Sequence, residues 1–251
     1  ALKTQDTGNT YNVAVGHAAG MSVTTGIQNT IVGGEAGDAL TTGSYNIAIG
    51  YRALTSEDTL DGNIAIGYKA LAVQDGGSGN TAVGYQAGDA ISTGDNNTLI
   101  GSAAGSDMTT GSNNIIIGRL ATASAVDVSN EITLGNSSIS AIRAQVTSIS
   151  SLSDKRDKKD IKNSTYGLDF VDSLKPVTFE WDQRDGNRSG IKDVGFIAQD
   201  LQEVDDEYTR LVYESNPDKL EATYGRLIPI MAKAIQELSA EVKELKKQIN
   251  G

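Results

Sequence analysis

The sequence predicts a mainly β protein in two parts. The first is a stacked β-solenoid, or β-roll, of 17-residue repeats, and the second is a small α+β domain that ends in a long coiled-coil helix. Three observations support this: a break in composition near residue 150, a repeat in register before it, and a heptad pattern after it. Residues 1–150 hold 22 of the 28 glycines but only 5 of the 21 basic residues, and no proline, tryptophan or phenylalanine. The chain therefore joins two parts that must build their cores from different kinds of residue.

The first part repeats a short apolar motif every 17 residues. Eight copies in register are typical of a solenoid, because one coil cannot bury its apolar face alone and must stack on its neighbours. We expect each coil to contain a short alternating strand, a small-residue corner and a turn rich in Gly and Thr. Coils about 4.8 Å apart would form a rod of roughly 40 Å. The copies are NVAVG at 12–16, NTIVG at 29–33, NIAIG at 46–50 and 63–67, NTAVG at 80–84, NTLIG at 97–101, NIIIG at 114–118 and EITLG at 131–135.

The repeat leaves open whether each chain coils by itself or three chains wrap together. Its small apolar content, mostly Ile, Val and Ala, favours several chains sharing one core. The repeat also resembles the head modules of trimeric autotransporter adhesins, whose NxxIGxxA-like coils stack into β-rolls. The asparagine that opens each motif is expected to form a turn or a ladder that satisfies backbone groups.

Three tyrosines follow the motif glycine in consecutive coils: Tyr51, Tyr68 and Tyr85. They should form a ladder along one face. Because aromatic faces stack on carbohydrate rings, this ladder is a candidate contact for a glycan or receptor on a host surface. The alternative is a ladder that only stabilises neighbouring coils. The threonine pairs of the turns are too interrupted for an ice-binding array, and no GGxGxD repeat indicates a calcium-loaded roll.

The last hundred residues have a mixed α+β pattern. Alternation predicts strands at 177–181, 194–198 and 208–214, and helical residues at 199–204. From Leu227 onward, apolar residues at alternating spacings of three and four predict a coiled-coil helix, with Pro229 near its start. The alternative is a helix packed on its own domain. The seam by itself would favour two strands, so the trimer is not predicted from it. The seam residues are Ile228, Met231, Ile235, Leu238, Val242, Leu245 and Ile249.

Three motifs in this region closely resemble the endosialidase-type intramolecular chaperone, which closes many phage tail spikes and tail fibres. They are SDKRDKKDIK at 153–162, GFIAQDLQEV at 195–204 and YGRLIPIMAKAIQELSAEVKELKKQI at 224–249. The resemblance implies a domain that assembles a homotrimer and then cuts itself off between Leu152 and Ser153. It further implies that Ser153 is the nucleophile and Lys158 its base. The expected domains are the fibre at 1–140, a junction at 141–152 and the chaperone at 153–251.

This chemistry is reasonable for the residues present. A serine hydroxyl needs a base, and a lysine can serve where burial or neighbouring cations lower its pKa. Lys155, Arg156 and Lys159 are such cations near Lys158. Asp154 is expected in a turn or a salt bridge rather than as a third catalytic residue.

Composition excludes several other functions. The net charge of −11 argues against binding to nucleic acid or to an anionic membrane surface. No apolar stretch is long enough for membrane insertion, and without cysteine there is no disulfide or thiolate zinc site. We expect no metal and no cofactor.

The sequence therefore predicts the C-terminal part of a trimeric phage tail fibre or spike. It would be assembled in the host cytoplasm and belong to the virion, with the chaperone part released by a single-turnover serine peptidase that acts only on its own chain. The alternative is a surface adhesin with a permanently attached trimerisation domain and no cleavage. A free-standing hydrolase is disfavoured, because the repeat has no acid pair or metal cluster with suitable spacing.

Overall fold

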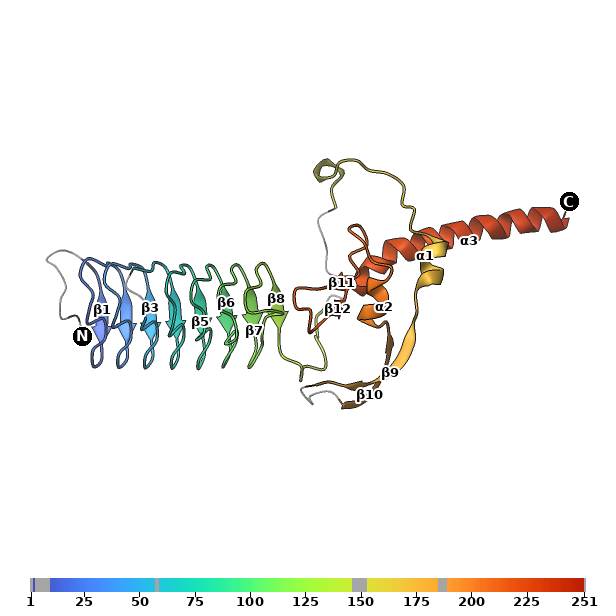
Figure 1. Cartoon of the computed structure of the whole chain (residues 1–251). Coiled ribbons are helices and arrows are strands. Elements are labelled where there is room, and N and C mark those ends of the chain that lie inside the picture. The colour runs from blue at the N-terminus through green and yellow to red at the C-terminus, as the bar shows by residue number, and fades with distance from the viewer. Residues whose placement is uncertain (1, 3–9, 57–58, 146–152, 185–188, 251) are drawn as a thin grey trace. The chain divides into compact units, whose positions relative to one another are not determined.

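The computed structural model describes residues 2, 10–56, 59–145, 153–184 and 189–250. The chain divides into two compact units, Ala1–Ser140 and Ala141–Gly251, which are both drawn in Figure 1. In the described part of the chain, no helix combines the length and apolar character needed to cross a membrane.

The first unit is a solenoid whose eight strands form one parallel sheet in chain order (Figure 1). Each strand pairs in register with the next coil, so that Val13 lies opposite Thr30 and Ala14 opposite Ile31. The predicted period and the mainly β class are confirmed. The strands are β1 (Val13–Val15), β2 (Thr30–Val32), β3 (Ile47–Ile49), β4 (Ile64–Ile66), β5 (Thr81–Val83), β6 (Thr98–Ile100), β7 (Ile115–Ile117) and β8 (Ile132–Leu134).

The interior of the solenoid is built from small and medium apolar side chains of one chain. In β2 to β7 the middle residue of the strand points inward and is fully buried, and so are the alanines at the small-residue corner. Larger side chains such as Leu40, Leu71, Ile91 and Met108 fill the remaining space. One chain therefore closes each coil and its core by itself, and the expectation that several chains share one core is wrong because Leu and Ile side chains of the same chain fill the interior.

The motif asparagines form a buried ladder along the solenoid, as expected. Each Oδ1 accepts a hydrogen bond from the backbone N–H of the corresponding residue in the next coil, at 2.7 to 3.0 Å. Each Nδ2 donates to a turn carbonyl 14 residues later, as Asn80 does to Gly94 at 2.7 Å. The ladder ends at Glu131, whose carboxylate accepts from the N–H and hydroxyl of Ser124 and from the hydroxyl of Thr133.

The motif glycines are required where neighbouring coils approach most closely. Gly67 has a φ of +139°, a region that residues with a side chain rarely adopt. A Cβ at Gly67 would also overlap the carbonyl oxygen of Gly84 in the next coil. Only glycine therefore allows the backbones to stack at this corner.

The second unit contains short elements around a small core and one long helix. Its core is Leu201, Leu211, Val212, Leu227 and Ile230. The elements are the 3₁₀ turns η1 (Lys155–Asp157) and η2 (Tyr224–Arg226), helices α1 (Leu168–Ser173), α2 (Ala198–Gln202) and α3 (Leu227–Asn250), the antiparallel pair β9 (Val177–Asp182) and β10 (Ser189–Gly195), and the antiparallel pair β11 (Val212–Tyr213) and β12 (Glu221–Ala222).

Several elements differ from their predicted bounds. The strand predicted over 208–214 is reduced to Val212–Tyr213, because the Asp206 carboxylate accepts the N–H groups of Tyr208 and Thr209 and turns the chain there. The strand predicted at 194–198 lies earlier, at 189–195, and Ala198 instead begins α2. Pro229 is the third residue of α3, which agrees with its expected place near the helix start.

Candidate active site

The first residues of the described C-terminal segment bring Ser153 and Lys158 together. Lys158 Nζ donates a hydrogen bond to Ser153 Oγ at 2.6 Å and a longer one to the Ser153 carbonyl oxygen at 3.3 Å. The turn η1 lies between them and folds the chain back, with Lys158 N–H donating to the Lys155 carbonyl at 3.2 Å. A hydroxyl within hydrogen-bond reach of an amine is the arrangement that a serine nucleophile with a lysine base requires.

Asp154 is the N-cap of this turn. Its Oδ1 accepts the Arg156 backbone N–H at 2.8 Å, and its carboxylate also binds the Arg156 guanidinium, with Nη2 at 2.7 Å from Oδ2. The hydrogen bonds from Arg156 lower the pKa of Asp154, and the same side-chain contact raises the pKa of Arg156. Asp154 therefore has both the turn and the salt-bridge role expected from the sequence.

The surroundings of the pair are open and contain charged residues of both signs. Ser153 and Lys158 are exposed in the single chain, and Lys155 and Lys159 are their neighbours in sequence. Leu152, the expected residue before the cut, lies outside the described residues.

Helix α3 uses two faces for different purposes. Leu227, Ile230 and Ala234 are buried on its own domain. The predicted seam lies on the other face and is exposed, from 41% at Val242 to 80% at Ile249. The sequence offers two alternatives for this helix, packing on its own domain or forming a coiled coil. The structure shows one face packed on the domain, while the seam on the other face is exposed.

A contact between distant residues ties α3 to α1. The Glu237 carboxylate accepts the Leu168 backbone N–H at 2.7 Å and pairs with Lys233 at 2.9 Å. The bond from Leu168, followed by that from Lys233, lowers the pKa of Glu237. The sequence shows the Lys233–Glu237 pair at a spacing of four, but gives no sign that its carboxylate caps a helix 69 residues earlier.

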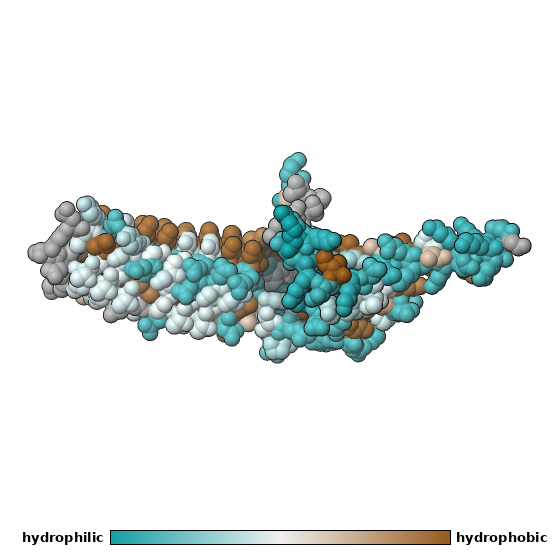
Figure 2. Space-filling model, turned by 90° about the horizontal axis from the view of Figure 1, so that it is seen from above, coloured by the Kyte–Doolittle hydropathy of each residue, from teal (hydrophilic) through white to brown (hydrophobic). Residues whose placement is uncertain are grey.

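The outside of the solenoid sheet carries a continuous apolar face. The first and third residues of every strand point away from the core, and all sixteen are Val, Ile, Leu or Thr. In the middle strands they are half-buried, as at Ile64 and Ile66, and at the last strand they are exposed, as at Ile132. Figure 2 shows apolar side chains along one side of the solenoid. A face of this extent is typical of an interaction surface.

The three tyrosines form the predicted ladder. The Tyr51 and Tyr68 ring centroids are 5.8 Å apart at 22°, and those of Tyr68 and Tyr85 are 5.0 Å apart at 8°. Lys69 Nζ lies 5.6 Å from the centroid of the Tyr68 ring. The inner ring faces therefore contact neighbouring rings, while the side chains remain 39% to 54% exposed.

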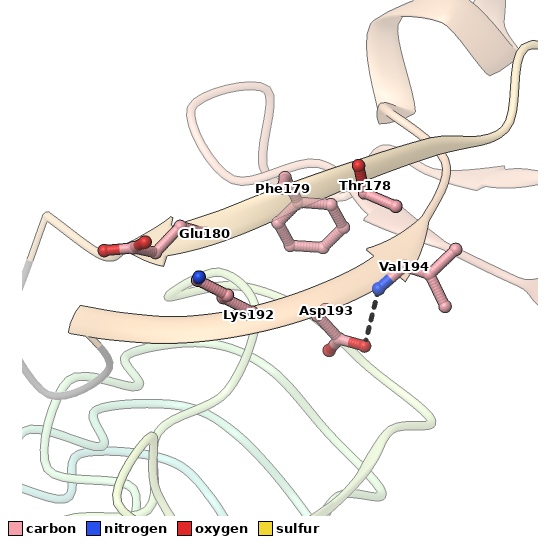
Figure 3. A pocket seen from close by; sticks show the side chains of 6 residues that line it. All are labelled: Thr178, Phe179, Glu180, Lys192, Asp193 and Val194. Carbon is pink, nitrogen blue, oxygen red and sulfur yellow. Dashed lines mark hydrogen bonds between the residues drawn. The ribbon is translucent and has the colours of Figure 1, made fainter.

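An open hollow lies on the β9–β10 hairpin (Figure 3). Asp193 pairs with Phe179 across the hairpin, and its carboxylate accepts the Val194 N–H at 2.8 Å and the Trp181 indole N–H at 3.1 Å. Six residues line the hollow, and none of them is a serine or a histidine. They are Thr178, Phe179, Glu180, Lys192, Asp193 and Val194. Among the described residues, no group of three or more His, Asp or Glu side chains is placed to hold a metal ion.

Comparison with known proteins identifies the C-terminal part. Residues 153–212 match the family model described as the chaperone of endosialidase, and this match begins at the serine of the Ser153–Lys158 pair. The second unit therefore contains a domain of the endosialidase chaperone type, which supports a chaperone role of the phage tail-fibre kind. No curated protein and no solved structure matches the chain.

Proposed function

We propose that this chain is the C-terminal part of a trimeric phage tail fibre or tail spike. Residues 1 to about 152 would form the fibre. Residues 153–251 would act as an intramolecular chaperone that aligns three chains and then releases itself by cutting between Leu152 and Ser153. The observation that carries the proposal is the 2.6 Å contact between Lys158 Nζ and Ser153 Oγ at the first residue of the family match.

The proposed reaction uses one water and no cofactor or metal. Ser153 Oγ attacks the carbonyl carbon of Leu152, while neutral Lys158 takes the hydroxyl proton. The C–N bond breaks, Lys158 returns the proton to the Ser153 nitrogen, and Leu152 is held as an ester on Ser153 Oγ. Water then hydrolyses the ester and leaves a carboxylate on Leu152 and a free amine on Ser153. The reaction occurs once per chain and would act on no other substrate.

Trimer formation is supported by the two uncovered apolar surfaces. The seam of α3 and the outer face of the solenoid sheet both carry large side chains exposed in the single chain, such as Leu245 at 56% and Ile132 at 66%. Burying such residues stabilises an assembly by roughly 25 cal/mol per Å² of apolar area. We propose that three copies cover both surfaces with each other.

The repeat itself explains why a chaperone would be useful. Consecutive coils present nearly identical outer residues, so three chains that slip by one coil of 17 residues would lose little contact energy. A trimerising domain at one end fixes the register before the slow parallel pairing is complete. Removing that domain afterwards would leave the fibre unable to unfold along the same path, which is kinetic stability.

The test compares the wild-type chain with Ser153→Ala and Lys158→Gln by intact and native mass spectrometry. We expect wild type to give two fragments that meet at Leu152 and Ser153, with a trimeric N-terminal product. Both variants should stay intact and trimeric. Lys162→Gln is the matched control for the loss of one lysine charge and should be cut normally. An intact wild-type trimer would refute the cleavage and favour the alternative, a surface adhesin with a permanently attached trimerisation domain.

Host attachment is the proposed role of the released fibre, in the virion after assembly in the host cytoplasm. The tyrosine ladder of Tyr51, Tyr68 and Tyr85 is the candidate contact for a glycan or other receptor, because its side chains are partly exposed. The competing role is stabilisation by the stacked rings. A glycan array with wild type and Tyr85→Ala separates the two roles, since only a binding ladder loses glycan signal while the trimer stays folded.

A further inference from the structure

Four exposed residues, 154–157, connect Ser153 to Lys158 and form the turn that brings the two side chains together. We infer that Asp154 is a positioning residue for self-cleavage: by capping the turn η1 it folds Lys158 back over Ser153. The inference rests on the proposed cleavage, but the contact between Lys158 and Ser153 that the cap explains is present without any reaction. Among the described residues the Asp154 carboxylate binds Arg156 and no hydrogen bond joins it to Lys158, so Asp154 is assigned a positioning role and not a catalytic one.

The hydrogen bonds of the turn identify this role. Asp154 Oδ1 accepts the Arg156 N–H at 2.8 Å, which is the N-cap bond, while the Asp154 carbonyl accepts the Asp157 N–H at 3.2 Å. The Lys158 N–H closes the turn by donating to the Lys155 carbonyl at 3.2 Å. The backbone of Lys158 itself is extended. One cap thus determines where the chain reverses and from which point the lysine side chain projects.

The turn depends on this cap because little else supports it. Residues 153–165 are all exposed, and η1 contains no buried residue. An isolated turn of this length is marginal, since each ordered residue loses backbone entropy for few hydrogen bonds. An aspartate at the N-cap satisfies a backbone N–H that otherwise has no partner within the turn. Losing the cap should reduce the fraction of chains in which Lys158 reaches Ser153.

The ion pair between Asp154 and Arg156 is a separable contribution. The Arg156 side chain is 88% exposed, and exposed ion pairs contribute little. The backbone cap therefore has the larger effect. Asn provides the same side-chain acceptor for an N-cap but carries no charge, so Asp154→Asn keeps the cap and removes the ion pair.

The experiment follows cleavage of the full chain in a cell-free translation reaction between pH 6 and pH 9. Trimer formation is measured in the same samples by native mass spectrometry. Asp154→Ala should cut about fivefold more slowly at every pH, which corresponds to about 1 kcal/mol. It should form trimers at the wild-type rate. Asp154→Asn should restore the rate to within about twofold of wild type. The matched control is Asp157→Ala, which removes the same charge from the same turn without touching the cap.

Each outcome decides the inference. Equal rates for Asp154→Ala and wild type, or no rescue by Asp154→Asn, would overturn the positioning role. A loss of trimer in Asp154→Ala would instead show a general structural role. If wild type is not cut at all, the proposed function fails, and the inference is judged by amine acetylation of intact chains. In that assay Lys158 should react more slowly than Lys159 in wild type but equally fast in Asp154→Ala, and no difference between the two chains would refute it.

Discussion

The asparagine ladder makes a sharp prediction about the stability of the solenoid. Asn80 is fully buried, and its side chain serves two backbone groups of other turns. Its Oδ1 accepts the Asn97 N–H at 2.8 Å, and its Nδ2 donates to the Gly94 carbonyl at 2.7 Å. Asn80→Ala removes both partners and leaves a buried donor and a buried acceptor without a hydrogen bond. At about 1 to 3 kcal/mol for each group, the loss is about 2 to 6 kcal/mol per chain.

Asn12 provides the matched control. It makes the same two bonds, to the Asn29 N–H and the Gly26 carbonyl, both at 2.7 Å. It is only half-buried in the first described coil, so water can replace the lost contacts. Asn12→Ala should therefore cost about 1 kcal/mol, the net value of an ordinary hydrogen bond.

The assay is guanidinium unfolding followed by circular dichroism, with both variants made in a Ser153→Ala background so that every chain has the same length. Amide hydrogen exchange at Asn97 gives the local readout, because its N–H loses its acceptor. We expect a clearly lower midpoint and faster exchange for Asn80→Ala alone. If the two variants unfold within about 0.5 kcal/mol of each other, the ladder does not stabilise the fold through buried partners and the reasoning is wrong.

Three further predictions concern packing, assembly and pH. Gly67→Ala should lower the stability by about 3 kcal/mol in thermal unfolding, because Gly67 has a φ of +139° and an added Cβ would overlap the next coil. Gly225→Ala is the control and should be neutral, since an added Cβ there has nothing within 4 Å. Leu238→Asp should convert the assembly to monomers in sedimentation, because it places a charge on the seam, while Ser239→Asp beside it should not. Burial raises the pKa of Asp205, but hydrogen bonds from a threonine and three backbone N–H groups outweigh it and hold that pKa below 3.8. This stabilisation is present above pH 3.8 and is lost as pH falls through the folded pKa, so acid titration should weaken wild type more than Asp205→Asn.

The solenoid could be predicted well from the sequence because the same short pattern of residues recurs in every coil. A residue type that recurs every 17 positions has one environment in every coil, so the inward alanines and the motif glycines could be assigned from their register. What the sequence did not reveal is the closure of each coil by one chain. Closure depends on how completely Leu40, Leu71 and Ile91 fill the interior of the solenoid. The 17-residue period does not determine this packing.

The C-terminal domain was predicted less completely because its structure depends on unrepeated, long-range contacts. The heptad pattern identified the exposed seam of α3, yet nothing in it indicated that Glu237 caps α1. The segment 208–214 alternates like a strand, but the Asp206 carboxylate competes for the backbone N–H groups and shortens it. The Ser153–Lys158 pairing came from the family resemblance. The sequence predicts Asp154 in a turn or a salt bridge, but only the structure shows that its carboxylate caps the turn between Ser153 and Lys158.

Glu131 stands at the motif position where the seven earlier coils have asparagine, and this matters at the open end of the solenoid. A parallel stack has no natural last member, because the final strand presents the same unpaired edge that every earlier strand used to recruit its successor. An asparagine at 131 would offer a free amide oxygen to a ninth rung or to the end of another molecule. Glu131 instead commits its carboxylate to Ser124 and Thr133 in its own coil. Among the described residues the asparagine ladder therefore ends at Glu131, whose side chain is satisfied inside its own coil.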